Sequence, residues 1–207
     1  MDTLRKHFPS LTQQQYEQLT ALGPLYSDWN AKINVISRKD IGNLYNQHVL
    51  HSMTIAKYVQ FASEDTVIDV GTGGGFPGVP LAILFPNTAF TLVDSIHKKL
   101  KVVDAVCAAL DIQNITTTHS RIEDIGTSFN YAVSRAVTRL DTVWRWVAPI
   151  VRQQPTTAHQ HGGLLYLKGG DISAEIPNKC IVQKIDLMRL INEPFFADKA
   201  LVHIYNK

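Results

Sequence analysis

TVIDVGTGGGFPG, residues 66–78, is the stretch of this sequence that decides its fold. A short apolar run typical of a buried strand leads into a glycine-rich turn, and an apolar segment typical of a helix follows. Glycine allows positive φ angles and close approach of a ligand, while the first turn of a helix offers unpaired N–H groups. The stretch therefore predicts a nucleotide-like cofactor bound at a strand-to-helix turn.

Short β-favouring runs alternate with helical segments from this stretch onward. The predicted strands are Thr66–Val70, Phe90–Asp94, Ile115–His119, Tyr131–Ser134, Leu164–Lys168, Ile181–Asp186 and Leu201–Tyr205. Such alternation predicts an α/β fold with a Rossmann-like, mostly parallel sheet of seven strands. No convincing helix separates the last two runs, so we expect the sheet to end in an antiparallel pair. One crossover helix is expected to begin after Ser95 as its N-cap and to bury Cys107.

The residues before this stretch have a helical pattern. Apolar side chains recur at three- and four-residue steps within 13–30, where Gly23-Pro24 is expected to kink or split the helix, and a second helical segment follows at 43–60. We therefore divide the chain into a helical N-terminal cap, residues 1–63, and a sheet domain, residues 64–207.

Composition sets limits on the class of protein. The 207 residues are 45% hydrophobic and 18% charged, as in a globular protein with one core, which excludes disorder, collagen and coiled coil for the whole chain. Twenty basic and 18 acidic residues give a net charge of +2, so any RNA contact must be a local basic patch. Cys107 and Cys180 fit neither a disulfide framework nor a zinc site. With no signal or membrane-spanning segment visible, we expect a cytoplasmic protein.

The spacing of the glycines identifies the cofactor class. The dinucleotide fingerprint requires glycine at the sixth position from Gly71, which is Phe76 here. The pattern acid-x-G-x-G-x-G, from Asp69 to Gly75, instead resembles the first motif of S-adenosylmethionine-dependent methyltransferases. Asp94 ends the next strand and can accept hydrogen bonds from ribose hydroxyls. The alternative is a tight turn without a ligand, in which Asp94 only caps a helix. The predicted cofactor contacts in this region are Asp69, Gly71, Gly73, Gly75 and Asp94.

Further motifs occur in the order and spacing of one known family. They are Trp29-Asn30, Asn34, NQHVLHS at 46–52, IDVGTGGGFPGVPL at 68–81, LVDS at 92–95, SRIE at 120–123, VSRA at 133–136 and LKG at 167–169. Together they resemble the bacterial 16S ribosomal RNA guanine-N7 methyltransferases, also called glucose-inhibited division protein B. The resemblance implies cofactor contacts at Gly71, Phe76, Ile122, Glu123 and Arg135. His51 departs from the family, which usually has aspartate there.

The chemistry implied by this resemblance is the transfer of a methyl group to guanine N7. That atom carries a lone pair, so no general base is needed and catalysis reduces mainly to placement. Exocyclic amine methylation generally uses an Asn/Asp-Pro-Pro-aromatic element where this chain has Ser134-Arg135-Ala136-Val137, and pyrimidine C5 methylation needs a well-placed cysteine. The alternatives are a methyltransferase for another RNA or a small molecule, a nicotinamide-dependent oxidoreductase, and a non-catalytic RNA-binding assembly factor.

Three side chains are candidates for the catalytic centre. Arg135 ends a strand at the edge where open α/β sheets bind ligands, and its guanidinium can hold a carboxylate or phosphate. The alternative for Arg135 is a surface residue paired with a nearby acid. Lys168 ends a strand at the same edge, where Gly169 and Gly170 leave room for a substrate, and its alternative is a structural role. His48 is expected either to line the base pocket or to link the cap to the sheet domain. His48 and His51 lack a third ligand at useful spacing, so no metal site is expected.

The implied partner is 16S ribosomal RNA, either free or within a small-subunit particle, and we expect a monomer without membrane contact. Basic residues near one another in the sequence could contact phosphates if they share a surface. The candidates are Lys32, Arg38, Lys39, His97, Lys98, Lys99, Lys101, Arg139 and Arg145.

Overall fold

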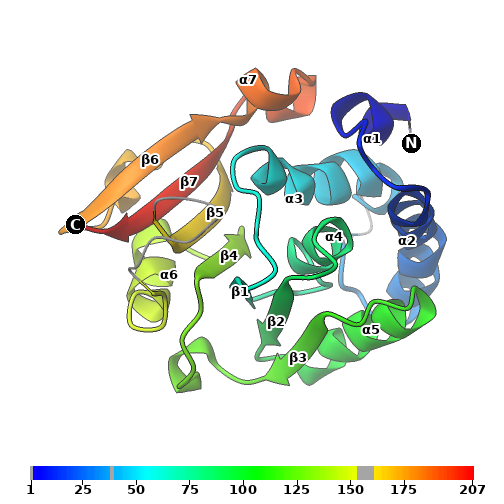
Figure 1. Cartoon of the computed structure of the whole chain (residues 1–207), viewed down its shortest axis with the longest axis horizontal. Coiled ribbons are helices and arrows are strands. Elements are labelled where there is room, and N and C mark those ends of the chain that lie inside the picture. Colours follow the sequence, from blue (N-terminus) through cyan, green and yellow to red (C-terminus); the bar gives the residue numbers. More distant parts are fainter. Residues whose placement is uncertain (1, 38–39, 153–160) are drawn as a thin grey trace.

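The computed structural model, which describes residues 2–37, 40–152 and 161–207, contains a seven-stranded sheet in the order β3-β2-β1-β4-β5-β7-β6 (Figure 1). All neighbouring pairs are parallel except those made by β7, which is antiparallel to both β5 and β6. The mostly parallel sheet predicted from the sequence is therefore confirmed. The strands are β1 Thr66–Val70, β2 Ala89–Asp94, β3 Ile115–His119, β4 Tyr131–Arg135, β5 Gly163–Gly169, β6 Cys180–Asp186 and β7 Lys199–Asn206.

The predicted strands agree with the observed ones to within two residues at each end, and the final antiparallel pair is confirmed. The expectation that no helix separates β6 from β7 is wrong. A five-residue helix, α7 (Leu187–Ile191), begins directly after β6, and the side chain of Asp186 caps it by accepting a hydrogen bond from the Met188 N–H at 2.9 Å. One turn and a half is too short for a periodic pattern to be visible in a sequence.

Helices cover both faces of the sheet and enclose two separate cores (Figure 1). On one face lie α2 (Gln13–Lys32), α4 (Gly78–Leu84) and α5 (His97–Ala109), together with the N-terminal helix α1 (Asp2–His7). The helix α6 (Leu140–Val147) covers the other face. Because the N-terminal helices and the sheet share one core, the division at residue 63 stays a prediction. Among the described residues, no helix is both long and apolar enough to cross a membrane.

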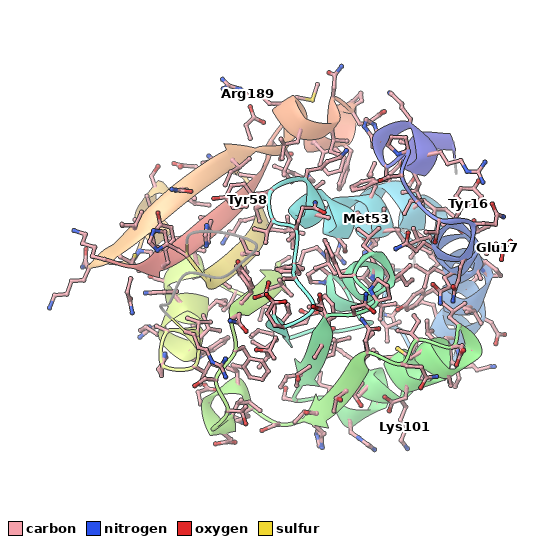
Figure 2. All side chains as sticks on the ribbon, viewed as in Figure 1. Tyr16, Glu17, Met53, Tyr58, Lys101 and Arg189 are labelled. Carbon is pink, nitrogen blue, oxygen red and sulfur yellow. The ribbon has the colours of Figure 1, made fainter. Side chains whose placement is uncertain are left out.

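The N-terminal helical segments differ from the regular helices that were expected. Helix α2 starts at a complete capping box on Thr12 and runs through Pro24 without being split. The second segment is a chain of three short helices, namely the π-helix η2 (Leu44–Leu50), α3 (His51–Met53) and the 3-10 helix η3 (Thr54–Lys57). π-Helical turns frequently occur at functional sites. Figure 2 shows the side chain of Met53 inside the molecule, where the α3 region packs on the core.

The remaining 3-10 helices lie in connections between strands or ahead of η2. They are η1 Ile41–Asn43, η4 Ile122–Asp124, η5 Ser173–Glu175 and η6 Pro194–Phe196. Cys107 is buried on α5, as predicted. Ser95 is not the N-cap of this helix, because the helix begins at His97 and its N-cap residue is Ile96, without a capping hydrogen bond from a side chain.

Candidate functional site

The glycine-rich loop between β1 and α4 holds three glycines at positive φ, as the sequence predicted: Gly71 (+66°), Gly73 (+60°) and Gly75 (+93°). At Gly71 a Cβ atom would lie 2.6 Å from a methyl group of Val137, so this glycine permits close packing within the protein. At Gly73 a Cβ atom would meet no described atom within 4 Å. The open side of the loop is therefore at Gly73, where a ligand can approach the backbone.

Asp69 lies under this loop and is fully buried. Its Oδ2 accepts hydrogen bonds from Thr72 Oγ1 at 2.6 Å and from the Gly78 N–H at 2.8 Å, so the carboxylate fixes both ends of the loop. Burial raises the pKa of Asp69 to about 7. Its Oδ1 has no hydrogen-bond partner among the described residues. Asp69 thus holds the loop in shape, and its contact with a cofactor ammonium stays a prediction.

Asp94 joins the end of β2 to the loop. Its Oδ2 accepts from the Gly73 N–H at 2.9 Å, and its Oδ1 accepts from the Ile96 N–H at 2.8 Å at the start of α5. The alternative of helix capping is not borne out, because α5 begins at His97 after the N-cap residue Ile96 and no side chain caps it. Asp94 instead links the glycine-rich loop to the turn ahead of α5. Each carboxylate oxygen has a second lone pair, so these bonds do not exclude acceptance from a ribose hydroxyl.

A pocket of about 290 Å³ opens beside this loop at the carboxyl ends of β1, β2 and β3. It brings together four of the predicted cofactor residues, namely Gly71, Asp94, Ile122 and Glu123. Ile122 is buried on η4 and offers an apolar wall, whereas the neighbouring Glu123 is exposed. We call this the glycine-loop pocket; it is lined by Val70, Gly71, Val93, Asp94, Ser95, Ser120, Arg121, Ile122, Glu123, Val137 and Trp146.

These residues fit a nucleoside-bearing cofactor such as S-adenosylmethionine. The backbone at Gly73 is open, Asp94 supplies acceptor oxygens for hydroxyl groups, and Ile122 and Val137 supply apolar surface for a base. Val137 is 37% exposed although it is apolar, which leaves its side chain available to a ligand.

Phe76, another predicted cofactor contact, lies outside the glycine-loop pocket. It is 4% exposed, and its ring packs against Tyr26 at 4.9 Å and His48 at 5.4 Å between ring centroids. The guanidinium of Arg135 lies over the same ring at 5.4 Å. Phe76 therefore supports the side chains of the neighbouring site, and its own contact with a cofactor stays a prediction.

Arg135, at the end of β4, holds the centre of that second site. Its Nη1 donates to the Gln47 carbonyl at 2.8 Å, and its Nη2 lies 2.7 Å from His48 Nδ1. Because a guanidinium only donates hydrogen bonds, His48 must accept through an unprotonated Nδ1. Burial and the charge of Arg135 accordingly lower the pKa of His48 to about 4. Burial lowers the pKa of Arg135 to about 10, which leaves it charged at neutral pH.

A pocket of about 520 Å³ opens around Arg135 and includes all three predicted catalytic residues, Arg135, Lys168 and His48. The segment after β4 separates the two pockets, because Ala136 and Thr138 line this one whereas Val137 lines the glycine-loop pocket. We call it the arginine pocket; it is lined by Asp40, Gln47, His48, His51, Arg135, Ala136, Thr138, Tyr166, Leu167, Lys168, Gly169, Phe195 and Lys199.

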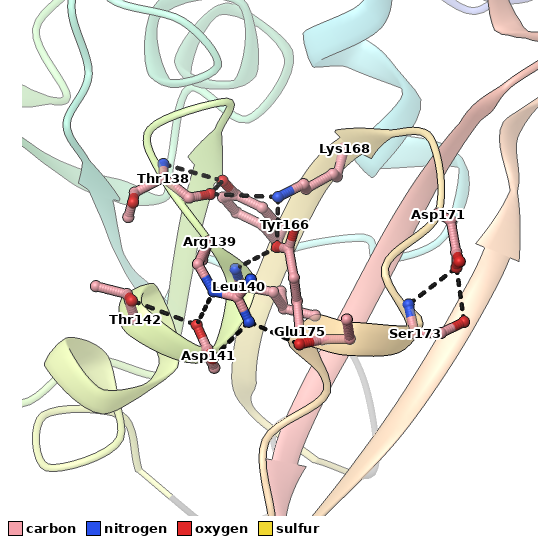
Figure 3. Close-up of polar contacts among 11 residues, drawn as sticks. Thr138, Arg139, Leu140, Asp141, Thr142, Tyr166, Lys168, Asp171, Ser173 and Glu175 are labelled. Atoms are coloured by element: carbon pink, nitrogen blue, oxygen red, sulfur yellow. Dashed lines mark hydrogen bonds and ion pairs between the residues drawn. The ribbon is translucent and has the colours of Figure 1, made fainter.

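Lys168 lies on the wall of the arginine pocket but is held in an ion pair. Its Nζ contacts Glu175 Oε2 and lies 3.4 Å from the Thr138 carbonyl, within the network of Figure 3. Lys168 is also near the face of Tyr166, 5.9 Å from the ring centroid. Glu175 in turn accepts from the Leu140 N–H at 2.8 Å, at the start of α6. The geometry favours the structural alternative for Lys168, and its catalytic role stays a prediction.

His51, Phe195 and Lys199 are among the lining residues of the arginine pocket that were not predicted from the sequence. His51 differs from the family pattern, and this difference was the signal in the sequence. Phe195 lies on η6 in a connection without a periodic pattern and Lys199 begins β7, so only the fold brings these two residues to Arg135.

The basic residues proposed for RNA contact are distributed over both faces of the sheet. Lys98, Lys99 and Lys101 lie on α5, and Lys101 points outward in Figure 2, whereas Arg139 precedes α6 on the opposite face and pairs with Asp141 at 3.0 Å. Lys32 pairs with Asp28, and Arg38 and Lys39 lie outside the described residues.

Comparisons with known proteins agree with this architecture. Residues 15–198 match the family model described as rRNA small subunit methyltransferase G. The chain is 47% identical to the ribosomal RNA small subunit methyltransferase G of Flavobacterium johnsoniae, over 99% of this chain and 97% of that protein. An rRNA methylase structure from Streptococcus thermophilus superposes with a TM-score of 0.51 at 13% identity, covering 76% of this chain and 94% of that one.

A coclaurine N-methyltransferase, in a structure bound to N-methylheliamine and SAH, superposes with a TM-score of 0.50 at 12% identity. That match covers 57% of this chain and 35% of the other. At such low identity, the two structural likenesses show that the fold is that of class I methyltransferases.

Proposed function

Because the chain belongs to the rRNA small subunit methyltransferase G family, we propose that it transfers a methyl group from S-adenosylmethionine to N7 of a guanine in 16S ribosomal RNA. The observation that carries this proposal is the pair of adjoining pockets at the carboxyl edge of the sheet. They are separated by residues 136–138 alone, so a donor in one and an acceptor in the other would meet there.

The glycine-loop pocket is the proposed cofactor site. S-adenosylmethionine supplies an electrophilic methyl group on a sulfonium. The chain's part is to bind and orient: the loop leaves space at Gly73, Asp94 accepts hydrogen bonds from hydroxyl groups, and Ile122 and Val137 contact the base. A related fold bound to SAH supports this choice of cofactor. The contacts of Asp69, Phe76 and Glu123 belong to the same proposal.

The arginine pocket is the proposed site of the acceptor base. Methylation of guanine N7 needs no general base, because no proton has to be removed. The pocket matches this requirement, because the Nδ1 lone pair of His48 already accepts a hydrogen bond from Arg135. Arg135 keeps its positive charge and can orient the electron-rich Hoogsteen edge of the base through N–H groups that Gln47 and His48 leave free. Holding acceptor and methyl in line can supply ~7–11 kcal/mol of the barrier.

Cysteine chemistry is disfavoured by the positions of both thiols. Cys107 is buried on α5 and burial raises its pKa to about 12, so it is not a nucleophile at neutral pH. Cys180 is at the start of β6, where its Sγ donates to the Pro177 carbonyl at 3.3 Å. Neither lines the arginine pocket. This favours a purine N7 over a pyrimidine C5 acceptor.

The proposal extends to the setting of the reaction. A monomer acting in the cytoplasm on 16S RNA, either free or in a small-subunit particle, is consistent with the small net charge of +2 and local basic residues.

The test uses the purified chain, S-adenosylmethionine with a labelled methyl group, and small-subunit RNA from cells lacking this methyltransferase. Naked RNA and intact particles are assayed in parallel, with transfer RNA as the comparison substrate. We expect one guanine of the small-subunit RNA to become cleavable as 7-methylguanosine. Label in transfer RNA alone, or at an atom other than N7, would contradict the proposed acceptor.

A further inference from the structure

One buried polar atom in the arginine pocket has no hydrogen-bond partner among the residues that the structure describes. His51, on α3, is 6% exposed, and its Nε2 makes no hydrogen bond to any described residue. Leaving a buried polar atom unpaired costs about 1–3 kcal/mol, so such an atom calls for an explanation. The side chain lines the pocket proposed to hold the acceptor base.

The protonation state of His51 is fixed by its surroundings. Burial, followed by the nearby charges of Arg135 and Lys199, lowers its pKa well below the usual value, so the imidazole is neutral. The carbonyl of Gln47 accepts a hydrogen bond from the ring. Since Nε2 is the nitrogen without a partner, Nδ1 carries the proton and Nε2 presents a lone pair. His51 Nε2 can therefore accept a hydrogen bond from a ligand.

An aromatic side chain lies beside this acceptor. The ring of Phe195, on η6, stands nearly perpendicular to His51 with centroids 5.6 Å apart, and its face carries the ammonium of Lys199 at 4.3 Å. Phe195 is half-buried and lines the arginine pocket. Aromatic faces of this kind stack on extruded bases.

We propose that His51 Nε2 accepts a hydrogen bond from N1–H of the acceptor guanine while Phe195 stacks on the base. This assignment rests on the proposed function and names the residues that select guanine. Phe195 and Phe196 both pack edge-on against the His51 ring, with centroids 5.6 Å away, so the base would enter as the Phe195 ring moves from this contact onto the face of the purine.

The shape of guanine agrees with this arrangement. N7 lies on the Hoogsteen edge of guanine and N1 on the neighbouring Watson–Crick edge, and the two edges meet at O6. Residues 136–138 adjoin the glycine-loop pocket, whereas α3 and η6 line only the arginine pocket. A guanine that directs N7 towards the segment after β4 can therefore direct its N1 edge towards the elements that carry His51 and Phe195.

This contact discriminates between purines. Adenine has a lone pair at N1 where guanine has a hydrogen, so adenine would place two acceptors against each other. A buried site that accepts a substrate N–H rejects analogues lacking it, because its polar group is left unpaired. His51 would thus be a specificity-determining and positioning residue, while Arg135 acts nearer the reacting edge.

The test compares His51→Phe, which removes the acceptor, with His51→Gln, whose Oε1 can occupy the place of Nε2. Tyr45→Phe is the matched control, because Tyr45 donates to the Thr20 carbonyl outside both pockets. We expect His51→Phe to lower kcat about 10- to 100-fold with little change in the KM for RNA or in S-adenosylmethionine affinity. His51→Gln should recover most of the loss, and Tyr45→Phe should keep wild-type kcat.

A second arm replaces the acceptor guanine, once mapped, by 1-methylguanosine in a synthetic RNA. Wild type and His51→Phe should then react at equal rates, since neither can form the contact. A wild-type advantage as large as on guanine would overturn the inference, as would a His51→Phe variant as fast as wild type on normal RNA. Failure of the wild-type protein to form 7-methylguanosine would instead refute the proposed function itself.

Discussion

The two pockets at the carboxyl edge of the sheet are built in different ways. The glycine-loop pocket is lined mostly by residues that end strands β1 and β2 or directly follow β1, β2 and β3. The arginine pocket is lined by residues spread between Asp40 and Lys199, on helices and strands far apart in the sequence. A loop that depends on left-handed glycines tolerates few residue types, whereas a site assembled from distant side chains can change its chemistry by single substitutions such as the histidine at position 51.

The largest effect confined to one of the two pockets should come from Gly73→Val, which is expected to abolish cofactor binding. The new side chain would point into open space, so the fold survives, but it would occupy the ligand's side of the loop at a positive φ. We expect S-adenosylmethionine binding to fall more than about 100-fold, at a stability cost of about 1–2 kcal/mol. Gly126→Val is the matched control, because its Cβ also meets nothing among the described residues and its φ is not positive. Calorimetric titration of both variants measures the difference, and unchanged affinity in a folded Gly73→Val protein would remove the loop from the cofactor site.

Arg135→Ala should give the opposite pattern. It removes the donor to His48 and Gln47 and the charge facing the acceptor base, so we expect kcat to fall about 100-fold. Cofactor affinity should change less than about 3-fold, because Arg135 does not line the glycine-loop pocket. Single-turnover methyl transfer and calorimetry separate the two effects. If the variant lost cofactor affinity and kept its turnover number, Arg135 would belong to the cofactor site.

The Lys168–Glu175 pair tests whether Lys168 stabilises the fold or takes part in catalysis. Both side chains are mostly buried, at 19% and 15% exposure, so removing one partner leaves the other unpaired. We expect Lys168→Met and Glu175→Gln each to reduce the free energy of unfolding by about 1–3 kcal/mol, with the double variant losing less than the sum. Urea denaturation measures the cycle. Additive losses in stability, together with a kcat loss confined to Lys168→Met, would restore Lys168 to the catalytic residues.

Asp94→Asn should have a smaller effect on the glycine-loop pocket. The amide oxygen can keep one of the two backbone hydrogen bonds, but the acceptor capacity towards a ribose falls. We expect cofactor affinity to fall about 10-fold while α5 stays folded. Calorimetry with S-adenosylhomocysteine measures the affinity, and wild-type affinity would leave Asp94 with only its structural hydrogen bonds to Gly73 and Ile96.

The smallest expected effect is the pH dependence that His48 gives to stability. Its pKa is lowered from 6.5 to about 4 in the folded protein, so the unfolded chain binds more protons below pH 6.5. Stability is therefore complete above that pH and is lost as the pH falls towards 4. Between pH 7.5 and 5.5 we expect wild type to lose about 1 kcal/mol more than His48→Gln, whose amide can still accept from Arg135. Equal losses in paired urea titrations would mean that His48 titrates normally.

The sequence predicted the glycine-loop pocket well because its parts are consecutive. The strand, the three left-handed glycines and the acid ending β2 follow one another within 30 residues, and each has few alternatives. It predicted less of the arginine pocket. Arg135, His48 and Lys168 were identified, but the pairing of Lys168 with Glu175 and the approach of Phe195 depend on tertiary packing. The wrong N-cap at Ser95 has the same origin, since the Ile96 N–H bonds to the Asp94 carboxylate in the turn ahead of the helix and the helix begins only at His97.

The central claim is that donor and acceptor occupy two separate pockets that meet at residues 136–138. Amide hydrogen exchange of the whole protein tests it most directly, first with S-adenosylhomocysteine and then with the substrate RNA added. We expect S-adenosylhomocysteine to protect amides at 71–75 and 122–124, and RNA to add protection at 47–51 and 194–199. Protection of 47–51 and 194–199 by S-adenosylhomocysteine alone, with the glycine loop unchanged, would contradict the two-pocket account.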